Sequence, residues 1–267
     1  MRRYLFIVFV FVQFACHAQQ ISICSWNLKN FGKSKSDETI GAIARILKPF
    51  DVVALQEIVA GTAGPQAVAK LVDELNRSGQ QWDYIISSPT SGSRYKSERY
   101  AFLWKRKKVK RVGEAWLDKK YAQAIEREPY LCRFQVGAKQ LTVVNFHAIT
   151  KGARPETEIK YFKFFPGIYP AHNLIFCGDF NLPESHSVFT PLKAQGYQST
   201  LVNQKTSLRM RCLQDDCLAS EYDNIYFNSH RLKFVSAGIL HFYQVYDSLE
   251  TARKVSDHVP IYVNLIM

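Results

Sequence analysis

The sequence predicts a mixed α/β fold, and three observations support this class. Strand and helix patterns alternate over residues 21–75, closely spaced strand patterns fill residues 83–146, and the alternation returns in the last third of the chain. Alternation of strands with helices is typical of α/β domains, whereas strands joined by short turns form antiparallel pairs. We therefore expect antiparallel hairpins stacked beside an α/β unit.

The opening unit is predicted as strand, helix, strand, helix. Residues 21–26 (ISICSW) and 51–57 (DVVALQE) are strand patterns, the first followed by a loop with Asn27 at the strand exit. One helix is expected from Ser36 until Pro49 stops it, and another follows Pro65. Their apolar faces are Ile40, Ile43, Ala44 and Leu47 in the first helix, and Val68, Leu71, Val72 and Leu75 in the second.

The rest of the chain contains mostly strand patterns. Strands are expected at residues 83–88, 99–105, 109–117, 130–136, 140–146, 173–180, 222–227, 231–239 and 258–266. Helices are expected at residues 156–164 and 185–196. The helices of the last third restore the alternation with which the chain begins.

Residues 1–18 are expected to be a secretory signal peptide. Two arginines precede an apolar run over residues 4–12, and residues 16–18 (CHA) form a cleavage site. The run is too short to span a bilayer, and Cys16 leaves a lipoprotein anchor as an alternative. The prediction is a secreted or periplasmic protein in which residues 19–267 form one domain, because no linker or repeat divides them.

The cysteines suit an oxidising compartment. Cys24, Cys132 and Cys177 lie in apolar strand patterns and are expected to be buried. Cys212 and Cys217 flank a polar stretch, so we expect a local disulfide between them. A zinc site would need more ligands than lie nearby.

The chain is basic, which indicates an acidic partner such as nucleic acid or an anionic surface. Its net charge of +12 becomes +10 when residues 1–18, with their two arginines, are removed. The densest basic run covers residues 105–111 (KRKKVKR). The alternative interpretation of that run is a solvated hairpin whose lysines protect a sheet edge.

Polar side chains that carry chemistry recur at the ends of predicted strands. In residues 175–185 (IFCGDFNLPES), side-chain alternation places Asp179 and Asn181 together at an exposed edge, with Phe180 in the core. Taken alone, this pattern also fits a polar turn after a core strand. Other strand ends add Asn27, Glu57, His147, Asp223, Asp257 and His258. Together, these carboxylates, amides and histidines are suited to hydrolysing a phosphate ester with a hard divalent ion.

Short motifs follow one another over nearly the whole chain after residue 18: WNLKNFG, LQE, SERYAFLWK, EREP, VVNFHA, GDFN, YDNI and SDHVP. In order and approximate spacing they resemble the endonuclease/exonuclease/phosphatase superfamily, and within it the deoxyribonuclease I-like enzymes. GDFN with a late SDH is fairly specific for the superfamily, and ERYAF with REP narrows the resemblance to the deoxyribonuclease branch. The resemblance implies a four-layer α/β/β/α sandwich of two mixed sheets.

The resemblance also implies a role for each matching residue. Glu57 matches the principal metal ligand, and the residues that complete or support the metal region are Asn27, Asp179 and Asp257. The ion is expected to be Mg²⁺, with Mn²⁺ or Ca²⁺ as alternatives. His258 paired with Asp223 matches the base that activates water. His147 paired with Glu98 matches the acid or the group that stabilises the phosphate.

Substrate contacts are expected from further matching positions. Asn181 matches a residue that holds a phosphate oxygen, and Arg127 matches a phosphate-contacting arginine. Tyr95 and Lys29 are further candidates. The enzymes of this branch insert an arginine into the minor groove two residues after the metal glutamate, but that position is Val59 here. Their groove tyrosine lies two residues before the ERY glutamate, whereas Tyr95 lies three before it, and their long-loop disulfide has no equivalent.

The sequence therefore predicts a secreted, divalent-metal-dependent nuclease that hydrolyses phosphodiester bonds of DNA with little sequence preference, with RNA as a further substrate. The alternative is a secreted phosphodiesterase of the same fold that acts on a lipid head group, as bacterial sphingomyelinases do. A third hypothesis, a binding module without catalysis, would not need the full set of carboxylates and histidines. Nucleic acid is the expected partner as substrate, with no stable membrane insertion and no obligate protein partner.

Overall fold

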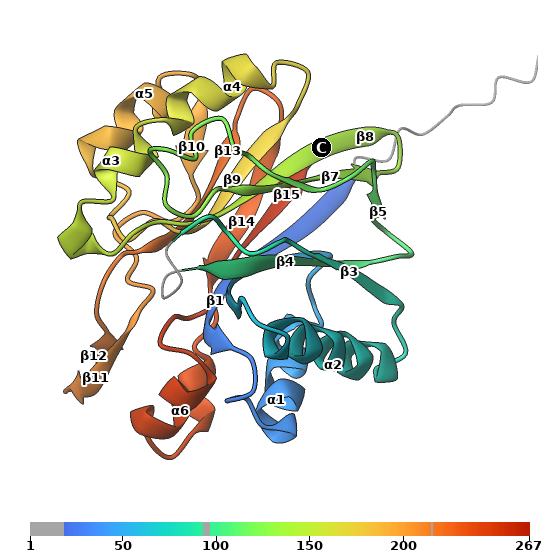
Figure 1. Ribbon diagram of the computed structural model, residues 1–267, viewed down its shortest axis with the longest axis vertical. Coiled ribbons are helices and arrows are strands. Elements are labelled where there is room, and N and C mark those ends of the chain that lie inside the picture. The colour runs from blue at the N-terminus through green and yellow to red at the C-terminus, as the bar shows by residue number, and fades with distance from the viewer. Residues whose placement is uncertain (1–18, 93–96, 215) are drawn as a thin grey trace, which may run out of the picture.

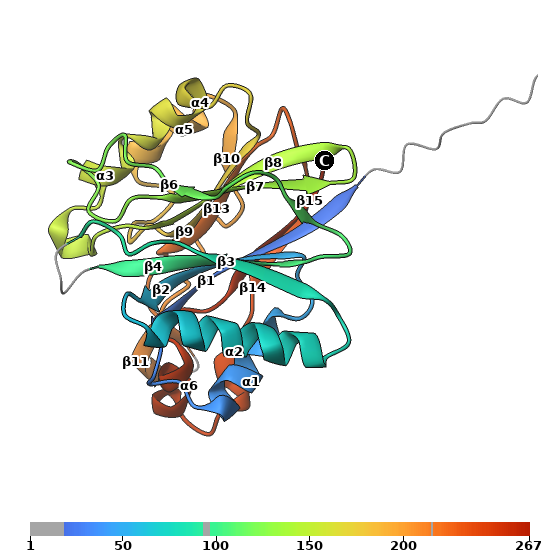
Figure 2. The ribbon, with the colours of Figure 1, turned by 45° about the vertical axis from the view of Figure 1, so that its right-hand side comes forward.

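Two β-sheets pack face to face between two layers of helices, so the fold has four layers, α/β/β/α (Figures 1 and 2). The computed structural model describes residues 19–92, 97–214 and 216–267. The expected signal peptide, residues 1–18, lies outside the described residues. The predicted mixed α/β class and the four-layer arrangement are confirmed.

The first sheet contains both parallel and antiparallel neighbours. Its strands are, in spatial order, β14 (Lys233–Ile239), β15 (Ile261–Ile266), β1 (Gln20–Phe31), β2 (Val52–Val59), β4 (Glu98–Lys105) and β3 (Trp82–Ile86). β1 and β2 run parallel, and the other neighbours run antiparallel. The helices on its outer face are α1 (Asp37–Leu47), α2 (Ala63–Arg77) and α6 (Leu249–Val255) (Figure 2).

The second sheet is also mixed. Its strands are, in spatial order, β10 (Tyr197–Ser199), β13 (Asp223–Asn228), β9 (Leu174–Asp179), β8 (Lys139–His147), β7 (Tyr130–Val136) and β5 (Lys110–Arg111), and β6 (Trp116–Leu117) also pairs with β7. β8 and β9 are parallel. Its outer face carries α3 (Glu156–Ile159), α4 (Phe165–Ile168) and α5 (Thr190–Lys193) (Figure 1). A separate hairpin, β11 (Leu208–Leu213) with β12 (Asp216–Leu218), projects from the body.

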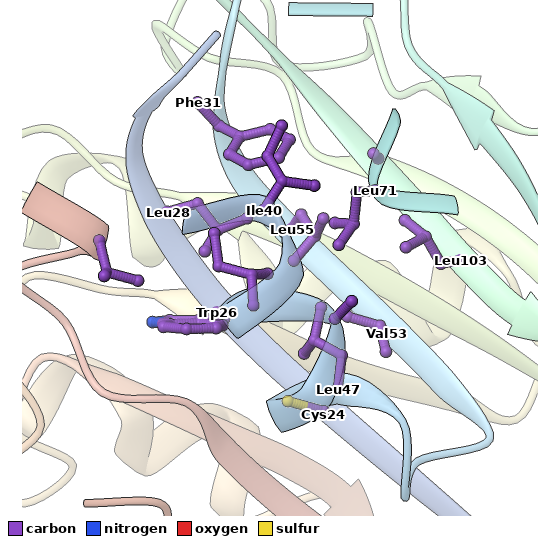
Figure 3. Packing of buried hydrophobic residues seen from close by; sticks show 14 of the residues in the cluster. Cys24, Trp26, Leu28, Phe31, Ile40, Leu47, Val53, Leu55, Leu71 and Leu103 are labelled. Atoms are coloured by element: carbon purple, nitrogen blue, oxygen red, sulfur yellow. The ribbon is translucent and has the colours of Figure 1, made fainter. Parts of the chain in front are cut away.

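Side-chain alternation along the strands divides the apolar residues among three cores. In β1, Ile21 and Ile23 point into the core between the sheets, whereas Cys24 and Trp26 point toward the helices. Figure 3 shows the packing of this helix-facing core. A third core lies between the second sheet and its own helices. Both faces of each sheet are therefore buried, which explains why the strands are apolar almost continuously.

The two long helices form where their sequence pattern places them. Ser36 caps α1 by accepting a hydrogen bond from the Thr39 amide at 3.2 Å, and acidic residues occupy the first turn, where they complement the helix dipole. All four predicted apolar positions of each helix are buried. These predictions are confirmed, as are the buried free thiols of Cys24, Cys132 and Cys177 and the Cys212–Cys217 disulfide.

Several predicted boundaries were wrong. The first strand continues to Phe31 instead of ending before Asn27. Residues 109–117 form two short strands separated by Gly113, which has a φ of 68°. Residues 185–196 contain only a 3₁₀ turn and the short α5, and sequence patterns missed α6 and β10 to β12. Residues 105–111 do not form a hairpin within one sheet, since they connect β4 of the first sheet to β5 of the second.

The predicted helix at residues 156–164 is divided into α3 and a 3₁₀ turn over Phe162–Phe164. Aromatic residues are too densely spaced here for one α-helical face. Side chains at i and i+3 align in a 3₁₀ turn, and this geometry lets Phe162 and Phe165 point inward together. Both rings are buried, with centroids 5.3 Å apart.

The described residues contain no helix with both the length and the apolarity needed to cross a bilayer.

Gly178 allows β9 to approach β8 closely, and its replacement tests this constraint. Its φ is 139°, and a Cβ at this position would lie 1.8 Å from the Phe146 carbonyl oxygen. We expect Gly178→Ala to lower the free energy of unfolding by about 1–3 kcal/mol, measured by urea denaturation. Gly167→Ala is the control, because no neighbour lies within 4 Å of a Cβ there. Equal unfolding midpoints for the two variants would contradict the constraint.

Candidate active site

The functional side chains lie at one end of the interface between the two sheets. Along the inward faces, apolar residues give way to polar ones toward that end: in β8, Val143 is followed by Asn145 and His147, and in β9, Cys177 is followed by Asp179. Residues two apart share a strand face. The same alternation that builds the apolar core therefore directs these polar groups into a common space.

A buried hydrogen-bond network forms the floor of this space and joins the sheets. Gln56 Nε2 donates to Asn145 Oδ1 at 2.6 Å and to Ser25 Oγ at 3.0 Å, and Asn145 Nδ2 donates to the Leu55 carbonyl oxygen at 3.0 Å. Gln56 and Asn145 are fully buried. Since an unpaired buried amide is costly, the pairing fixes how the two sheets meet directly beneath Glu57 and His147.

His147 forms the first histidine–carboxylate pair of the site. Its Nδ1 lies 2.9 Å from Glu98 Oε2, and its backbone amide donates to the Tyr100 hydroxyl at 3.1 Å. The Nε2 atom faces the pocket, 3.5 Å from Asp179 Oδ2 and 4.0 Å from Glu57 Oε1. Burial lowers the pKa of His147, but the Glu98 and Asp179 carboxylates together outweigh burial and leave the pKa above its ordinary value.

His258 forms the second pair. Its Nδ1 lies 2.7 Å from Asp223 Oδ2, and the same oxygen accepts a hydrogen bond from the Thr206 hydroxyl at 2.6 Å. Its Nε2 lies 3.5 Å from Asp179 Oδ2. Burial opposes the charged imidazolium, but the Asp223 and Asp179 carboxylates raise the pKa of His258 to about 10. Each histidine thus has one nitrogen held by a carboxylate and the other directed toward Asp179.

Each of these pairs has one member from either sheet. Glu98 begins β4 of the first sheet and His147 ends β8 of the second, while His258 precedes β15 and Asp223 begins β13. The sheets must therefore pack in one relative position for either pair to form.

Glu57 and Asp179 form the acidic centre of the site, linked by Asn27. Asn27 Nδ2 donates to Glu57 Oε1 at 2.9 Å and to Asp179 Oδ2 at 3.2 Å. Glu57 has a φ of 58°, at a point where the pairing of β2 with both neighbours shifts register. A positive φ at a non-glycine residue costs about 1–3 kcal/mol and is typical of functional positions. The irregularity turns the Glu57 carboxylate into the pocket.

Asp179 and Asn181 are buried, so the predicted exposed edge was wrong. Their exposed fractions are 1% and 8%, while Phe180 lies in the core as expected. Asn181 has a φ of 53°, its backbone amide donates to Asp179 Oδ1 at 2.9 Å, and its Nδ2 donates to the Ala148 carbonyl oxygen at 3.1 Å. Both side chains nevertheless line the pocket.

The cationic candidates occupy the rim and one wall. Arg127 Nε donates to the His147 carbonyl oxygen at 2.9 Å and Nη2 donates to the Ala148 carbonyl oxygen, which holds the guanidinium beside the pocket. Lys29 forms an ion pair of 2.8 Å with Asp257, which also pairs with Arg253 at 3.2 Å. Burial alone would raise the pKa of Asp257, but Lys29, His258 and Arg253 hold it below its ordinary value.

These groups surround a pocket of about 490 Å³. The predicted site residues that line it are Lys29, Glu57, Glu98, Arg127, His147, Asp179, Asn181, Asp257 and His258. Asn27 and Asp223 are buried behind this lining. Tyr95, the remaining predicted residue, lies outside the described residues.

Comparisons with known proteins agree with this architecture. The family model described as "Endonuclease/Exonuclease/phosphatase family" matches residues 24–258. A deoxyribonuclease of Thioalkalivibrio sp. is 30% identical over 91% of this chain and 70% of its own length. Deoxyribonuclease gamma of Rattus norvegicus is 29% identical over 97% of this chain and 88% of its own.

The chain belongs to the endonuclease/exonuclease/phosphatase family. The same fold occurs in a crystal structure of a family protein from Bacteroides thetaiotaomicron, with a TM-score of 0.68 and 17% identity over 94% of this chain and 98% of that one. The resemblance on which the site residues were matched is thus confirmed at the level of the family.

Sequence patterns missed three residues that support the site of this family member. Thr206 holds the Asp223 carboxylate, Ser256 donates from its hydroxyl to the Asn27 carbonyl oxygen at 2.5 Å, and Trp26 Nε1 donates to the His258 carbonyl oxygen at 2.7 Å. Ser256 and Trp26 lie within the motifs SDHVP and WNLKNFG, so their presence in these motifs could have indicated a role in the site. Thr206 lies in a polar stretch without periodicity, and nothing in the sequence there indicated its role.

The donor set fits a hard divalent cation beside Glu57 and Asp179. Within the described residues, the ion pairs of these two carboxylates involve only histidine rings, so no lysine or arginine is in direct contact with either. Asp179, Asp223 and His258 also place ligand atoms within 4.8 Å of one another, but Asp223 and His258 already bind each other. Asp257 is a weaker candidate for a metal ligand, because Lys29 and Arg253 already pair with it. Asn27 is also weaker, because its side chain directs nitrogen, and not oxygen, toward Glu57 and Asp179. We therefore consider Glu57 and Asp179 the strongest candidates for metal ligands.

The raised pKa of His258 predicts a loss of stability with rising pH in metal-free protein. A folded-state pKa of about 10, against 6.5 without the fold, means that the stabilisation is complete below about pH 6.5 and declines as pH approaches 10. We expect the urea midpoint, measured in chelator between pH 6.5 and 8.5, to fall more steeply for the natural protein than for His258→Gln. Parallel curves would show that His258 is not held as an imidazolium.

Proposed function

We propose that this family member is an exported nuclease that depends on a divalent cation and hydrolyses phosphodiester bonds of DNA, and also of RNA, with little sequence preference. The observation that carries the proposal is the convergence of both histidine Nε2 atoms on Asp179 Oδ2, each at 3.5 Å. Two relatives that match most of this chain are named deoxyribonucleases, which supports DNA as the substrate class.

Glu57 and Asp179 would hold the cation, with Asn27 adjusting its amide between them. Carboxylate oxygens are the ligands that Mg²⁺ and Mn²⁺ prefer, and Ca²⁺ is a further candidate. When bound, the cation supplies positive charge that neutralises the phosphate and lowers the pKa of the neighbouring histidines.

The two histidine–carboxylate pairs suit opposite halves of proton transfer. Asp223 fixes the ring of His258 through Nδ1, so that a deprotonated Nε2 can accept a proton from the attacking water. Glu98 favours the charged form of His147, whose Nε2 then donates a hydrogen bond or a proton to the departing 3′ oxygen.

Phosphate binding would use the neighbouring donors. Arg127 keeps its charge beside the pocket, and the unused proton on the Asn181 amide nitrogen is available to a phosphate oxygen. Val59 lines the pocket where the resembling enzymes carry an arginine. Binding that rests on the backbone of the substrate carries little sequence information, which is consistent with low specificity.

A second candidate, the lipid-directed phosphodiesterase, is favoured by one observation. The β11–β12 hairpin exposes Met210 and Leu213 at 77% and 61%, and its base is tied to the site by a 2.7 Å hydrogen bond from the Leu208 amide to the Asp257 carbonyl oxygen. Exposed apolar side chains near a phosphodiesterase site suit a membrane surface. The nuclease proposal is stronger because the relatives named deoxyribonucleases match the chain almost throughout.

Parallel digestion of duplex DNA, single-stranded DNA, RNA and sphingomyelin tests the proposed function. We expect hydrolysis of the nucleic acids, its loss in chelator, and recovery when Mg²⁺ or Mn²⁺ is added in excess. Undiminished activity in chelator would contradict the assigned cation site. Hydrolysis of sphingomyelin alone would establish the second candidate instead.

Replacement of either site histidine should remove most of the activity. General acid or base groups typically contribute about 10²–10⁴-fold in rate, so His147→Ala and His258→Ala should each lower kcat by that range. His230→Ala is the matched control, because His230 is exposed in the turn between β13 and β14. Near-normal kcat in a folded site variant, judged by circular dichroism, would show that its role is misassigned.

Export places the enzyme outside the cytoplasm, in the medium or the periplasm. The pattern of residues 1–18 supports cleavage after Ala18. We expect the exported protein to begin at Gln19, as read by N-terminal sequencing. Recovery of exported protein that retains residues 4–12 would show that this segment is not a cleaved signal.

A further inference from the structure

Three aromatic rings that are only partly buried lie together at the outer helical layer of the second sheet. Tyr121 stacks on Tyr161 with ring centroids 4.6 Å apart and planes 29° apart, and it lies 6.2 Å from Phe164. Phe164 is 46% exposed, and both tyrosines are half-buried. We call these three side chains the aromatic platform. They stack at the surface although the core beneath them is already filled by Phe162 and Phe165.

Lysines surround this platform. Lys160 Nζ lies 5.2 Å from the centroid of the Tyr161 ring, and Lys163 Nζ lies 5.0 Å from that of Phe164. Lys119 and Lys120 precede Tyr121 and are exposed. The ion pairs of this layer among described residues join Arg154 to Glu156 and Lys193 to Glu184, so none of them compensates these four lysines.

A side groove of about 390 Å³ is lined by residues that stand in the chain between the platform and the catalytic pocket. Its lining includes Ala122, Ile125, Glu126, Ile149, Thr157 and Glu158. The charge of Glu158 in this groove is partly offset, because its oxygens accept hydrogen bonds from the Glu126 and Ile149 amides at 2.7 and 2.9 Å. The groove is therefore less repulsive to an anion than its carboxylates suggest.

Two segments of the chain each pass from the aromatic platform through the side groove to the catalytic pocket, or in the reverse direction. In the first, Tyr121 of the platform is followed by groove residues 122–126 and then by Arg127 of the catalytic pocket. In the second, Thr150 of the catalytic pocket leads through Thr157 in the groove to Tyr161 of the platform. Both segments therefore link the three features in the same order along the chain.

We infer that the aromatic platform and the side groove form an accessory binding track for single-stranded nucleic acid that leads into the catalytic pocket. Aromatic faces stack with any base, and lysines bind successive phosphates, so this combination binds single strands without reading sequence. The inference rests on the proposed nuclease function and adds a preferred form of substrate to it.

The chain length limits the distance along the track. Five residues, 122–126, lie between Tyr121 and Arg127. The Ala124 and Ile125 amides both donate hydrogen bonds to the Tyr121 carbonyl oxygen, so the segment is folded and shorter than the roughly 20 Å that an extended chain would span. At the per-strand rise of about 3.4 Å in B-form DNA, fewer than roughly six nucleotides cover this distance. A 20-mer is therefore long enough to occupy the platform and the catalytic pocket together.

Binding without cleavage tests the track separately from catalysis. Fluorescence anisotropy of labelled dT20 in chelator should show a Kd at least 10-fold higher for Lys160→Gln/Lys163→Gln/Phe164→Ala than for the natural protein, since stacking of one base alone is worth about that factor. The slope of log Kd against log salt should fall by about 1.4, roughly 0.7 for each lysine removed. The matched control is Lys233→Gln/Phe234→Ala, whose Phe234 is 45% exposed on β14.

Turnover gives the second readout. The triple variant should raise KM for dT20 while leaving kcat unchanged. Equal binding of dT20 by the triple variant, the control and the natural protein would overturn the track even if DNA cleavage is normal. Absence of nucleic-acid cleavage by the natural protein would overturn the proposed function, while the anisotropy result would still decide on the track.

A lipid surface is the competing occupant of the platform. Sedimentation with vesicles of phosphatidylcholine and phosphatidylserine distinguishes the two, since we expect the triple variant and the natural protein to bind vesicles alike. Loss of vesicle binding with unchanged dT20 affinity would replace the track by a membrane surface and refute the inference.

Discussion

The hydrogen bond between Gln56 and Asn145 is the constraint on which the site depends. Both amides are fully buried between the sheets, and the Gln56 Oε1 atom has no hydrogen-bond partner among the described residues. Loss of the Gln56–Asn145 bond would leave further polar groups unpaired at a cost of about 1–3 kcal/mol, so the bond favours the relative position of the sheets in which it forms. Both histidine–carboxylate pairs take one partner from either sheet. A shift of about 1 Å, which an apolar interface alone tolerates, would misplace both pairs, because such sites need a precision of about 0.5 Å.

Electrostatic repulsion at this interface explains why the site is costly without its ligands. Asp179 and Asp223 are buried with ligand atoms within 4.8 Å of each other, and Glu57, which adopts a positive φ, shares the Asn27 amide with Asp179. The proton on His258 and the amide of Asn27 offset part of the cost, since each places positive charge or a donor against a carboxylate. The fold bears this local strain because three apolar cores stabilise the layers around it. A cation that binds among these carboxylates would relieve their repulsion, and the free energy so recovered would strengthen its binding.

Much of the fold could be predicted because its signals are local. The helical spacing of Ile40, Ile43 and Leu47 and the cap at Ser36 define α1 without reference to the rest of the chain. Strand boundaries were less predictable, since β1 continues past Asn27 only through its pairing with β2. The short elements α6 and β10 have too little periodicity to be recognised, and they form because neighbouring strands and helices cover them.

For the site, the sequence by itself determined which side chains stand at strand ends and, by its motifs, the family to which they belong. Only the tertiary structure decided that Asp179 and Asn181 are buried, that Asp257 is paired with Lys29 and Arg253, and that Thr206 holds Asp223. The physical reason is the distance along the chain over which each property is determined. Side-chain direction follows from the alternation of neighbouring residues, whereas burial, charge pairing and pKa depend on segments that only the packing of two sheets brings together.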